Sequence, residues 1–292
     1  MTDRSGWLPL PAPGATPVRT LTVAGSDSGG GAGIEADLRT FTLLGVHGCV
    51  ALTAVTVQNS LGVTGVQEVD PDVVAAQIDT VVGDIGVSGV KTGMLASAPI
   101  VAAVADAFAR NGIGAGGDVG LVIDPVCASM HGDPLLHPEA LRTLIERLFP
   151  MATLVTPNLD EVRLITGIEV DDDDSQRAAV QALLDLGPRW ALVKGGHLRG
   201  SERSPDLLSD GRQFLRLDAP RIPTAHDHGA GDTLAAAAAA ALAHGLAVPD
   251  AAALAKDWIT RCVAAAYPLG AGHGPVNPLW RLRPPAPAPA PA

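Results

Sequence analysis

A glycine loop and an acid stand directly before an alanine-rich helix. The stretch His226-Asp-His-Gly-Ala-Gly-Asp232 runs straight into a series of alanines. Unpaired backbone N–H groups and the positive end of a helix dipole can hold an anion at such a point, and glycine lets the backbone come close to it. We therefore predict that Gly229, Ala230 and Gly231 form an anion hole, with Asp232 as a general base. Taken alone, the stretch is explained equally well by an ordinary helix whose first-turn acid complements the dipole.

The rest of the chain predicts an α/β fold that can position this loop. Short runs of Val, Ile, Leu and Thr alternate with helical patterns, and the runs are apolar without strict alternation, as in strands covered on both faces. We expect a three-layer α/β/α fold around a mostly parallel, doubly wound sheet, with ligands at the carboxyl ends of its strands. The expected strands are 20–24, 49–57, 89–92, 120–124, 153–156 and 191–194, and the expected helices are 32–45, 72–83, 98–110, 138–148, 158–166 and 175–186.

The pattern changes after Lys194. Two further apolar runs, 206–209 and 213–217, flank Asp210-Gly211, a favourable hairpin turn, so we expect an antiparallel edge to the sheet. Two helices, at about 230–244 and 250–266, then close the chain.

Both ends of the chain have a different composition from the middle. Residues 1–17 are rich in Pro, Ala and Gly, and residues 284–292 alternate Pro with Ala. Such segments are usually extended and poorly ordered. We therefore predict a single folded domain over residues 18–283 with a disordered tail at each end.

Composition excludes several classes of function. The formal net charge of −11 and the absence of Lys or Arg runs argue against nucleic-acid binding. No segment resembles a signal peptide or is long and apolar enough for a membrane span, so we expect no membrane partner. Cys49, Cys127 and Cys262 are widely spaced and odd in number, which predicts neither disulfides nor a zinc site and is typical of a cytoplasmic protein.

A second glycine-rich loop, Ala24 to Gly33, follows the first expected strand and opens the first helix. It loosely resembles a dinucleotide-binding fingerprint. A dinucleotide-dependent oxidoreductase would also need an acid near the end of the second strand, where this chain has Gln58-Asn59. A substrate-binding loop is the better interpretation.

Seven motifs in order carry a resemblance to a known family. The chain resembles the hydroxymethylpyrimidine and phosphomethylpyrimidine kinases of thiamin synthesis, in the ribokinase superfamily, over about residues 20–280. This resemblance implies phosphorylation of 4-amino-5-hydroxymethyl-2-methylpyrimidine or its monophosphate, with ATP and Mg²⁺ as cofactors. The motifs are AGSDSGGGAGIEADLRTF, TAVTVQNSLGV, KTGMLAS, DPVCASMHGDPLL, TPNLDE, LVKGGHL and GHGPV.

The resemblance implies that Gly25, Asp37, Gln58 and Met94 contact the pyrimidine. The Gln58 amide offers both donors and an acceptor, which suits the alternating edge of an aminopyrimidine. Without the resemblance, a helix-capping loop amide is the alternative interpretation of Gln58, and Met94 would more often belong to the core.

The resemblance also implies a magnesium and nucleotide site. Asn158 and Glu161 match an NxxE element, in which Asn158 lies beside the nucleotide and Glu161 holds Mg²⁺ through water, with Asp124 as a further acid near the metal. The same spacing is equally that of a helix capping box, and both interpretations can hold together.

Three further residues complete the implied nucleotide site. Lys194, at the end of an apolar strand, would neutralise phosphate charge, and Thr224 and Asp227 would contribute from the loop before the last two helices. We assign His228 no proton transfer and expect it to order this loop.

Two positions depart from the family pattern. Family members usually have GTGC where this chain has Gly229-Ala-Gly-Asp232, and Gln where it has Glu35. An ordinary carboxyl group, with a pKa of about 3.9, is ionised near neutrality, whereas a thiol with a pKa of about 8.5 is not. Asp232 should thus be the better base, but its charge would repel a phosphorylated acceptor. We hypothesise a shift towards the neutral alcohol or a pyridine such as pyridoxal.

Other functions remain open from sequence. The alternatives are a pyridoxal kinase of the same fold and a regulator that binds a pyrimidine or nucleotide without turnover. The antiparallel edge and the habit of the family suggest a homodimer.

Overall fold

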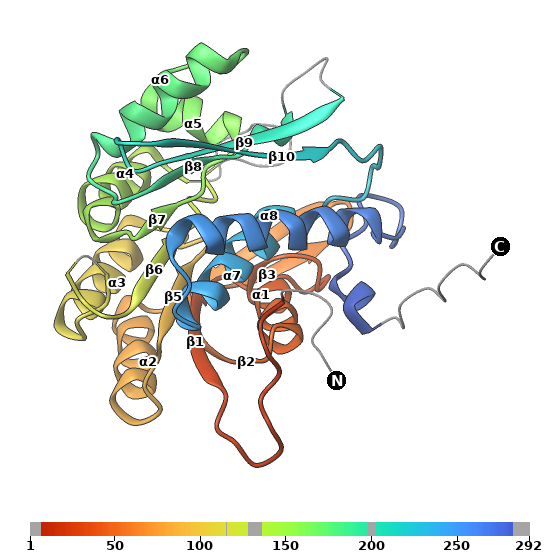
Figure 1. Ribbon diagram of the computed structural model, residues 1–292. Coiled ribbons are helices and arrows are strands. Elements are labelled where there is room, and N and C mark those ends of the chain that lie inside the picture. Colours follow the sequence, from red (N-terminus) through yellow and green to blue (C-terminus); the bar gives the residue numbers. More distant parts are fainter. Residues whose placement is uncertain (1–6, 115, 128–135, 198–201, 283–292) are drawn as a thin grey trace.

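The structure is a computed structural model that describes residues 7–114, 116–127, 136–197 and 202–282. Its centre is an eight-stranded sheet in the order β10-β9-β8-β7-β6-β5-β1-β2 (Figure 1). The pairs from β2 across to β8 are parallel, and β9 and β10 add the antiparallel edge, as predicted. The strands are β1 Val18–Ala24, β2 Val46–Leu52, β5 Gly89–Thr92, β6 Gly120–Ile123, β7 Leu154–Val155, β8 Ala191–Val193, β9 Arg203–Ser209 and β10 Phe214–Pro220.

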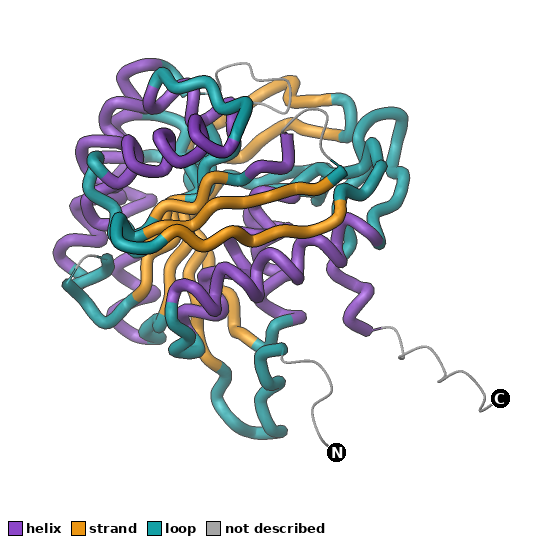
Figure 2. The backbone as a smooth tube through the Cα atoms, turned by 45° about the horizontal axis from the view of Figure 1, so that its top comes forward, coloured by secondary structure: helices purple, strands orange, loops and turns teal. Residues whose placement is uncertain are grey.

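Helices cover both faces of the sheet (Figure 2). One core joins the sheet to α2 through α6, and a second joins its other face to α1, α7 and α8. Within β6, Leu121 and Ile123 belong to the first core and Val122 to the second, because successive side chains of a strand point to opposite faces. The helices are α1 Gly33–Leu43, α2 Pro71–Asp84, α3 Ala98–Arg110, α4 Pro138–Thr143 continued by a π-helical turn Leu144–Leu148 and a 3-10 turn Phe149–Met151, α5 Leu159–Thr166, α6 Asp173–Leu184, α7 Ala230–Ala243, α8 Val248–Ala264, and short 3-10 turns Gly195–His197 and Pro278–Leu282.

The alanine run of α7 brings this helix unusually close to the sheet. Its residues 235–241 are fully buried. A Cβ at Gly89 on β5 would lie only 2.9 Å from the carbonyl oxygen of Ala239. Small side chains on both partners therefore permit a close approach, which places the first turn of α7 against the carboxyl ends of the central strands.

One expected strand is wrong. Residues 49–57 were predicted as a single strand, but the chain leaves the sheet at Thr53. From there β3 (Ala54–Asn59) pairs with β4 (Gly62–Glu68) as a separate antiparallel hairpin. The Thr53 hydroxyl donates to the Met94 carbonyl at 2.7 Å, which holds the chain where it turns away. An unbroken β pattern in sequence cannot reveal such a change of sheet.

The first described residues also differ from the expected disorder. Trp7 and Leu8 are buried, and the Trp7 ring centroid lies 5.4 Å from those of Trp258 and Trp280. An aromatic anchor thus ties part of the proline-rich segment to α8, which the composition did not indicate. The rest of the predicted tails, residues 1–6 and 284–292, lie outside the described residues.

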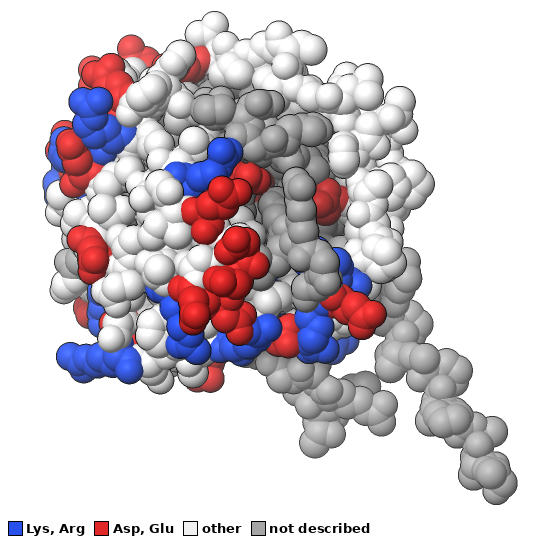
Figure 3. Space-filling view, turned by 90° about the horizontal axis from the view of Figure 1, so that it is seen from above, with Lys and Arg blue, Asp and Glu red and all other residues white. Residues whose placement is uncertain are grey.

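The surface carries charges of both signs. On the face seen in Figure 3, Asp and Glu side chains lie interspersed with Lys and Arg, without a continuous basic area. Among the helices in the described part of the chain, none combines the length and apolar character needed to cross a bilayer.

Candidate active site

Several of the predicted site residues converge at the carboxyl ends of the parallel strands. Gly25 follows β1, Asp124 follows β6 and Lys194 follows β8, while the first turn of α7 lies against the same edge. A Cβ at Gly231 would lie 3.2 Å from Asp124 Oδ2 and 3.3 Å from Lys194 Nζ. The anion loop predicted at the start of α7 therefore faces a carboxylate and a lysine.

The two glycine loops interlock around the start of α7. Gly229 has a positive φ of 76°. A Cβ on it would lie 2.0 Å from the Gly31 carbonyl oxygen, so no other residue fits there. Ala230 differs from prediction, because its N–H donates to the Asp227 carbonyl at 3.0 Å. The next N–H groups, of Gly231 and Asp232, belong to the first helical turn and have no partner within the helix.

Asp232 belongs to a buried ionic cluster that the sequence did not predict. Lys91 Nζ lies 2.9 Å from Asp232 Oδ1 and 2.9 Å from Asp37 Oδ2. The Thr22 hydroxyl donates to the same Asp37 oxygen at 2.6 Å. One lysine thus links two acids that come from α1 and α7. The only signal in the sequence was a lysine inside the otherwise uncharged strand Gly89–Thr92.

The cluster gives its two acids opposite shifts. Burial alone would raise the pKa of Asp232, but the charge of Lys91 and hydrogen bonds from Lys91 and the Gly33 N–H outweigh burial and lower it. Burial raises the pKa of Asp37 to about 7 despite the attraction of Lys91. Asp232 is therefore the acid that stays ionised, as a general base must.

Asp37 occupies a different place from the one expected. It was predicted to contact the pyrimidine, yet it is fully buried and its Oδ2 is taken up by Lys91 and Thr22. The structure places it behind Lys91, away from any surface that a substrate could touch. Its contact with the site is indirect, through Lys91.

Gly25, Met94 and Gln58 lie near the first glycine loop, and their contact with a pyrimidine stays a prediction. The Gly25 N–H donates to the Met94 carbonyl at 3.1 Å, and a Cβ on Gly25 would lie 2.6 Å from Met94 Cε. Gln58, on β3, has its Nε2 3.3 Å from His228 Nε2. His228 Nε2 is also 2.9 Å from Asp27 Oδ2, which fits the expectation that His228 orders its loop.

Asp27 and Glu35 organise the first loop, and sequence reasoning missed both roles. Burial favours the neutral form of Asp27, but bonds from His228 and from the N–H groups of residues 32, 29 and 31 lower its pKa to about 2. Glu35 Oε2 accepts the N–H of Asp27 at 2.8 Å. A glutamine carbonyl could accept the same bond, which explains why either residue suits this position.

The nucleotide side contains both the cap and the acids that the sequence predicted. Asn158 Oδ1 accepts the Glu161 N–H at 2.9 Å, and Glu161 Oε2 accepts the Asn158 N–H at 2.8 Å, which is a complete capping box. Lys194 Nζ lies 2.9 Å from Asp124 Oδ1, which also accepts the Thr156 hydroxyl at 3.0 Å.

This side suits a hydrated divalent cation. Burial raises the pKa of Glu161 to about 7. Burial would lower the pKa of Lys194, but the charges of Asp124 and Glu161 outweigh burial and raise it. No cluster of three or more His, Cys, Asp or Glu groups suited to a metal occurs among the described residues. Asp124 and Glu161 alone cannot complete a shell, but Mg²⁺ normally keeps several waters and adds phosphate oxygens.

Thr224 and Asp227 lie apart from these clusters. Both belong to the loop before α7, where the Thr224 hydroxyl accepts the His226 N–H at 3.0 Å. The Asp227 side chain is 42% exposed, 3.9 Å from His273. A nucleotide role for either residue stays a prediction.

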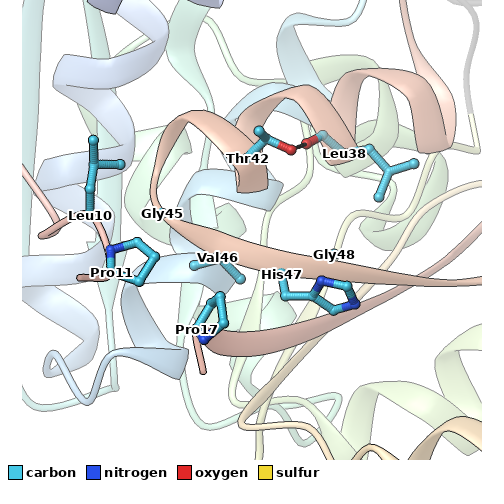
Figure 4. A pocket seen from close by; sticks show the side chains of 9 residues that line it. All are labelled: Leu10, Pro11, Pro17, Leu38, Thr42, Gly45, Val46, His47 and Gly48. Atoms are coloured by element: carbon cyan, nitrogen blue, oxygen red, sulfur yellow. Dashed lines mark hydrogen bonds between the residues drawn. The ribbon is translucent and has the colours of Figure 1, made fainter. Parts of the chain in front are cut away.

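A hollow of about 350 Å³ lies elsewhere, between the segment after Leu8 and the start of β2 (Figure 4). It is at the amino end of β2, whereas the ionic clusters are at the carboxyl ends. Its only ionisable lining group is His47, so it offers no comparable chemistry. The lining residues are Leu10, Pro11, Pro17, Leu38, Thr42, Gly45, Val46, His47 and Gly48.

The sheet order, the interlocked glycine loops and the ionic clusters together define a ribokinase-like small-molecule kinase. Residues 27–277 match the phosphomethylpyrimidine kinase family. A hydroxymethylpyrimidine/phosphomethylpyrimidine kinase from Mycobacterium tuberculosis (strain H37Rv) is 64% identical over 276 residues, which cover 94% of this chain and 99% of the relative. The chain therefore belongs to the phosphomethylpyrimidine kinase family.

Solved structures agree with this assignment. An ADP complex of Bacillus subtilis pyridoxal kinase superimposes with a TM-score of 0.83 at 36% identity, covering 92% of this chain and all of the other. A phosphomethylpyrimidine kinase from Clostridium difficile 630 gives a TM-score of 0.73 at 37% identity, covering 83% and 98%. Solved kinases of both names thus share the overall fold of this chain.

Proposed function

We propose that the chain is an ATP-dependent kinase that phosphorylates the hydroxymethyl group of 4-amino-5-hydroxymethyl-2-methylpyrimidine and, in a second step, its monophosphate. The observation that carries this proposal is the position of Asp232, an ionised acid in the first turn of α7 beside Gly231 and next to the Asp124–Lys194 pair. The family and the names of the relatives supply the substrate class.

The residues divide the chemistry between them. Asp232 accepts the hydroxyl proton of the acceptor while the N–H groups of Gly231 and Asp232 stabilise the transferring phosphoryl group. Lys194 neutralises triphosphate charge, and Asn158 orients Glu161 beside it. Mg²⁺, held through water by Glu161 and Asp124, would supply further positive charge at the phosphates.

The acceptor lies between the first glycine loop and the β3–β4 hairpin in this proposal. Gln58 leaves its contact with His228 and pairs with the aminopyrimidine edge, and Met94 packs against the ring above Gly25. Asp37 takes no direct part and acts only through Lys91.

The choice between alcohol and monophosphate depends on charge at Asp232. A carboxylate in place of the usual cysteine should repel a phosphorylated acceptor, but the Lys91 contact offsets part of that charge. We therefore expect a preference for the alcohol that is smaller than an isolated carboxylate would give. Steady-state kinetics with both acceptors test this, and equal or better efficiency with the monophosphate refutes the preference.

Pyridoxal is a second candidate acceptor because the pyridoxal kinase from Bacillus subtilis superimposes closely on this chain. A coupled assay of ADP release should compare the pyrimidine alcohol, its monophosphate and pyridoxal under identical conditions. We expect the pyrimidines to be used more efficiently. A higher kcat/KM with pyridoxal would reverse the assignment, and no ADP release with any acceptor would indicate a non-catalytic binding protein.

Asp232→Asn tests the base itself. The amide keeps the shape of the side chain but cannot take up a proton, so kcat should fall by about 10²- to 10⁴-fold. Near-normal turnover in this variant would refute the mechanism. Unchanged binding of ATP, measured by calorimetry, would show that the variant is folded.

We further propose a homodimer that works in the cytoplasm, where the three buried free cysteines stay reduced. The β3–β4 hairpin carries exposed valines on both sides: Val55 and Val57 are 48% and 61% exposed, and Val63 and Val66 are 51% and 53% exposed. Such a surface is typical of an interface. Sedimentation of the wild type against Val57→Lys should show a dimer converted to monomer; a monomeric wild type refutes this proposal.

A further inference from the structure

Lys91 is a fully buried lysine in the middle of the sheet. It lies on β5, paired with β1 on one side and β6 on the other, and its side chain is 0% exposed. Burying an ammonium group is costly unless partners compensate for the lost water. Here burial lowers the pKa of Lys91 less than Asp232, Asp37 and Asp124 raise it, so the group stays charged.

We propose that Lys91 is the positioning residue of the catalytic base: it fixes the direction of the Asp232 carboxylate and keeps this carboxylate ionised in a buried site. The inference rests on the proposed function and gives Lys91 a positioning role beyond the charge compensation described above. Lys91 touches neither acceptor nor nucleotide in this role and acts only through Asp232.

The contacts restrict Lys91 from both sides. Asp37, held by the Thr22 hydroxyl at 2.6 Å, accepts one hydrogen bond from the ammonium group, and Asp232 Oδ1 accepts another. Gly93 provides the necessary space, since a Cβ there would lie 2.9 Å from Lys91 Nζ and 3.6 Å from Asp232 Oδ1. Lys91 is therefore held in place, and it orients Asp232 together with the Gly33 N–H.

A simpler explanation is that Lys91 only neutralises Asp37. In that case, replacing both residues with apolar ones should leave the kinetics unchanged; for stability, such replacements of buried ion pairs are often neutral. The side chains of Lys91 and Asp37 are 0% exposed, whereas that of Asp232 is 14% exposed. The Lys91–Asp37 pair is therefore placed as a structural pair would be. The two explanations differ in what happens to Asp232 when both Lys91 and Asp37 are replaced.

The charges around Asp232 predict the direction of that change. It is faced by Lys91 from β5, Asp37 from α1, and Lys194 and Asp124 from the ends of β8 and β6. Lys194 is already paired with Asp124 at 2.9 Å. Without Lys91, the effect of burial would grow, so the base would become protonated at a higher pH, and only the Gly33 N–H would still orient its carboxylate.

The experiment compares kcat and its pH profile in four proteins. They are the wild type, Lys91→Met, Lys91→Arg and the double variant Lys91→Met/Asp37→Leu, which removes the pair without leaving Asp37 buried and unpaired. We expect the double variant to fold, to lose about ten- to a hundred-fold in kcat at pH 7, and to keep its KM for ATP within about two-fold. Its acid limb should move up by about one pH unit or more, and Lys91→Arg should recover part of the loss.

A double-mutant cycle isolates the path through Asp232. If Lys91 acts by positioning the base, Lys91→Met should have almost no further effect on kcat in an Asp232→Asn background. Lys256→Met is the matched control, since Lys256 is another buried lysine paired with a buried acid, Asp206, at 2.8 Å. It should cost stability but leave the acid limb in place.

Two results overturn the inference. Normal kcat and an unmoved acid limb in the double variant would show that Lys91 only neutralises Asp37, and equal losses from Lys91→Met with and without Asp232 would exclude the path through the base. A wild type that releases no ADP in the same assay refutes the proposed function itself, on which the inference rests. The wild-type arm therefore separates the two failures.

Discussion

The site contains two clusters of similar composition and different accessibility. In the first, Lys91 joins Asp37 and Asp232; in the second, Lys194 joins Asp124 and lies in the field of Glu161. Lys91 is 0% exposed, whereas Lys194 is 13% exposed. In each cluster, burial raises the pKa of one acid to about 7.

The difference follows from where each lysine stands on its strand. Lys91 lies within β5 and is paired on both sides, so its ammonium group is enclosed by α1 and α7. Lys194 comes one residue after β8, where the chain turns out of the sheet. A closed cluster can hold a base in a fixed protonation state, and an open one can meet an incoming phosphate.

Neighbouring residues of α7 connect the two clusters. Gly231 lies against Asp124 and Lys194, and Asp232 bonds to Lys91. The N–H groups that we assign to phosphoryl stabilisation thus lie between a proton-accepting side and a phosphate-binding side. Variants of each side should therefore give different kinetic signatures.

The largest effect that we expect in the open cluster, that of Lys194, Asp124 and Glu161, comes from Lys194→Met. Removing this charge leaves Asp124 beside Glu161 without a counter-ion at the phosphates, so KM for ATP should rise about ten- to a hundred-fold. KM for the pyrimidine should change little, and the acid limb of the pH profile should move up less than in the Lys91 variants, because Lys194 lowers the pKa of Asp232 less than Lys91 does. Steady-state kinetics with each substrate varied in turn measure all three.

Lys194→Arg is the control for charge, and it should retain most of the ATP affinity. If Lys194→Met instead lowers kcat and shifts the acid limb as far as Lys91 variants should, the two clusters do not act separately.

A smaller effect is expected where the clusters meet. A Cβ at Gly231 would lie 3.2 Å from Asp124 Oδ2 and 3.3 Å from Lys194 Nζ, so these side chains must move by a few tenths of an ångström. Gly231→Ala should fold and should lower kcat/KM for ATP by about two- to ten-fold, since a small misplacement in a phosphoryl-transfer site is costly. Gly83→Ala, where nothing lies within 4 Å, is the matched control. A Gly231→Ala enzyme as active as the control would show that the approach of α7 to Asp124 is not critical.

The sequence predicted the open cluster better than the closed one, for a physical reason. Lys194 and Asp124 each end an apolar run, and a parallel sheet brings such ends together without further information. Lys91 and Asp232 are 141 residues apart, and their contact depends on how closely α7 packs on β5. No local pattern records that distance.

Two other differences have the same origin. Asp37 was assigned from a motif, and only the structure shows that α1 turns it inward towards Lys91. The break at Thr53 between β2 and β3 depends on its bond to Met94, which is 41 residues away. Element types follow from local periodicity, whereas buried polar partners depend on the assembled fold.

The closed cluster should also be visible in the pH dependence of stability, as the smallest effect. Asp37 in the unfolded chain ionises near its ordinary pKa of 3.8, whereas in the folded protein it does so only near 7. Between these values the folded state binds more protons, so this group makes stability fall as pH rises from about 4 to 7. Asp37→Asn cannot ionise and should lack this contribution. Urea unfolding at several pH values should therefore show the wild type losing stability relative to the variant, by at most about 1.4 kcal/mol per pH unit. A difference that stays constant from pH 4 to 7 would mean that Asp37 is ionised in the folded protein throughout, with Lys91 compensating its burial fully.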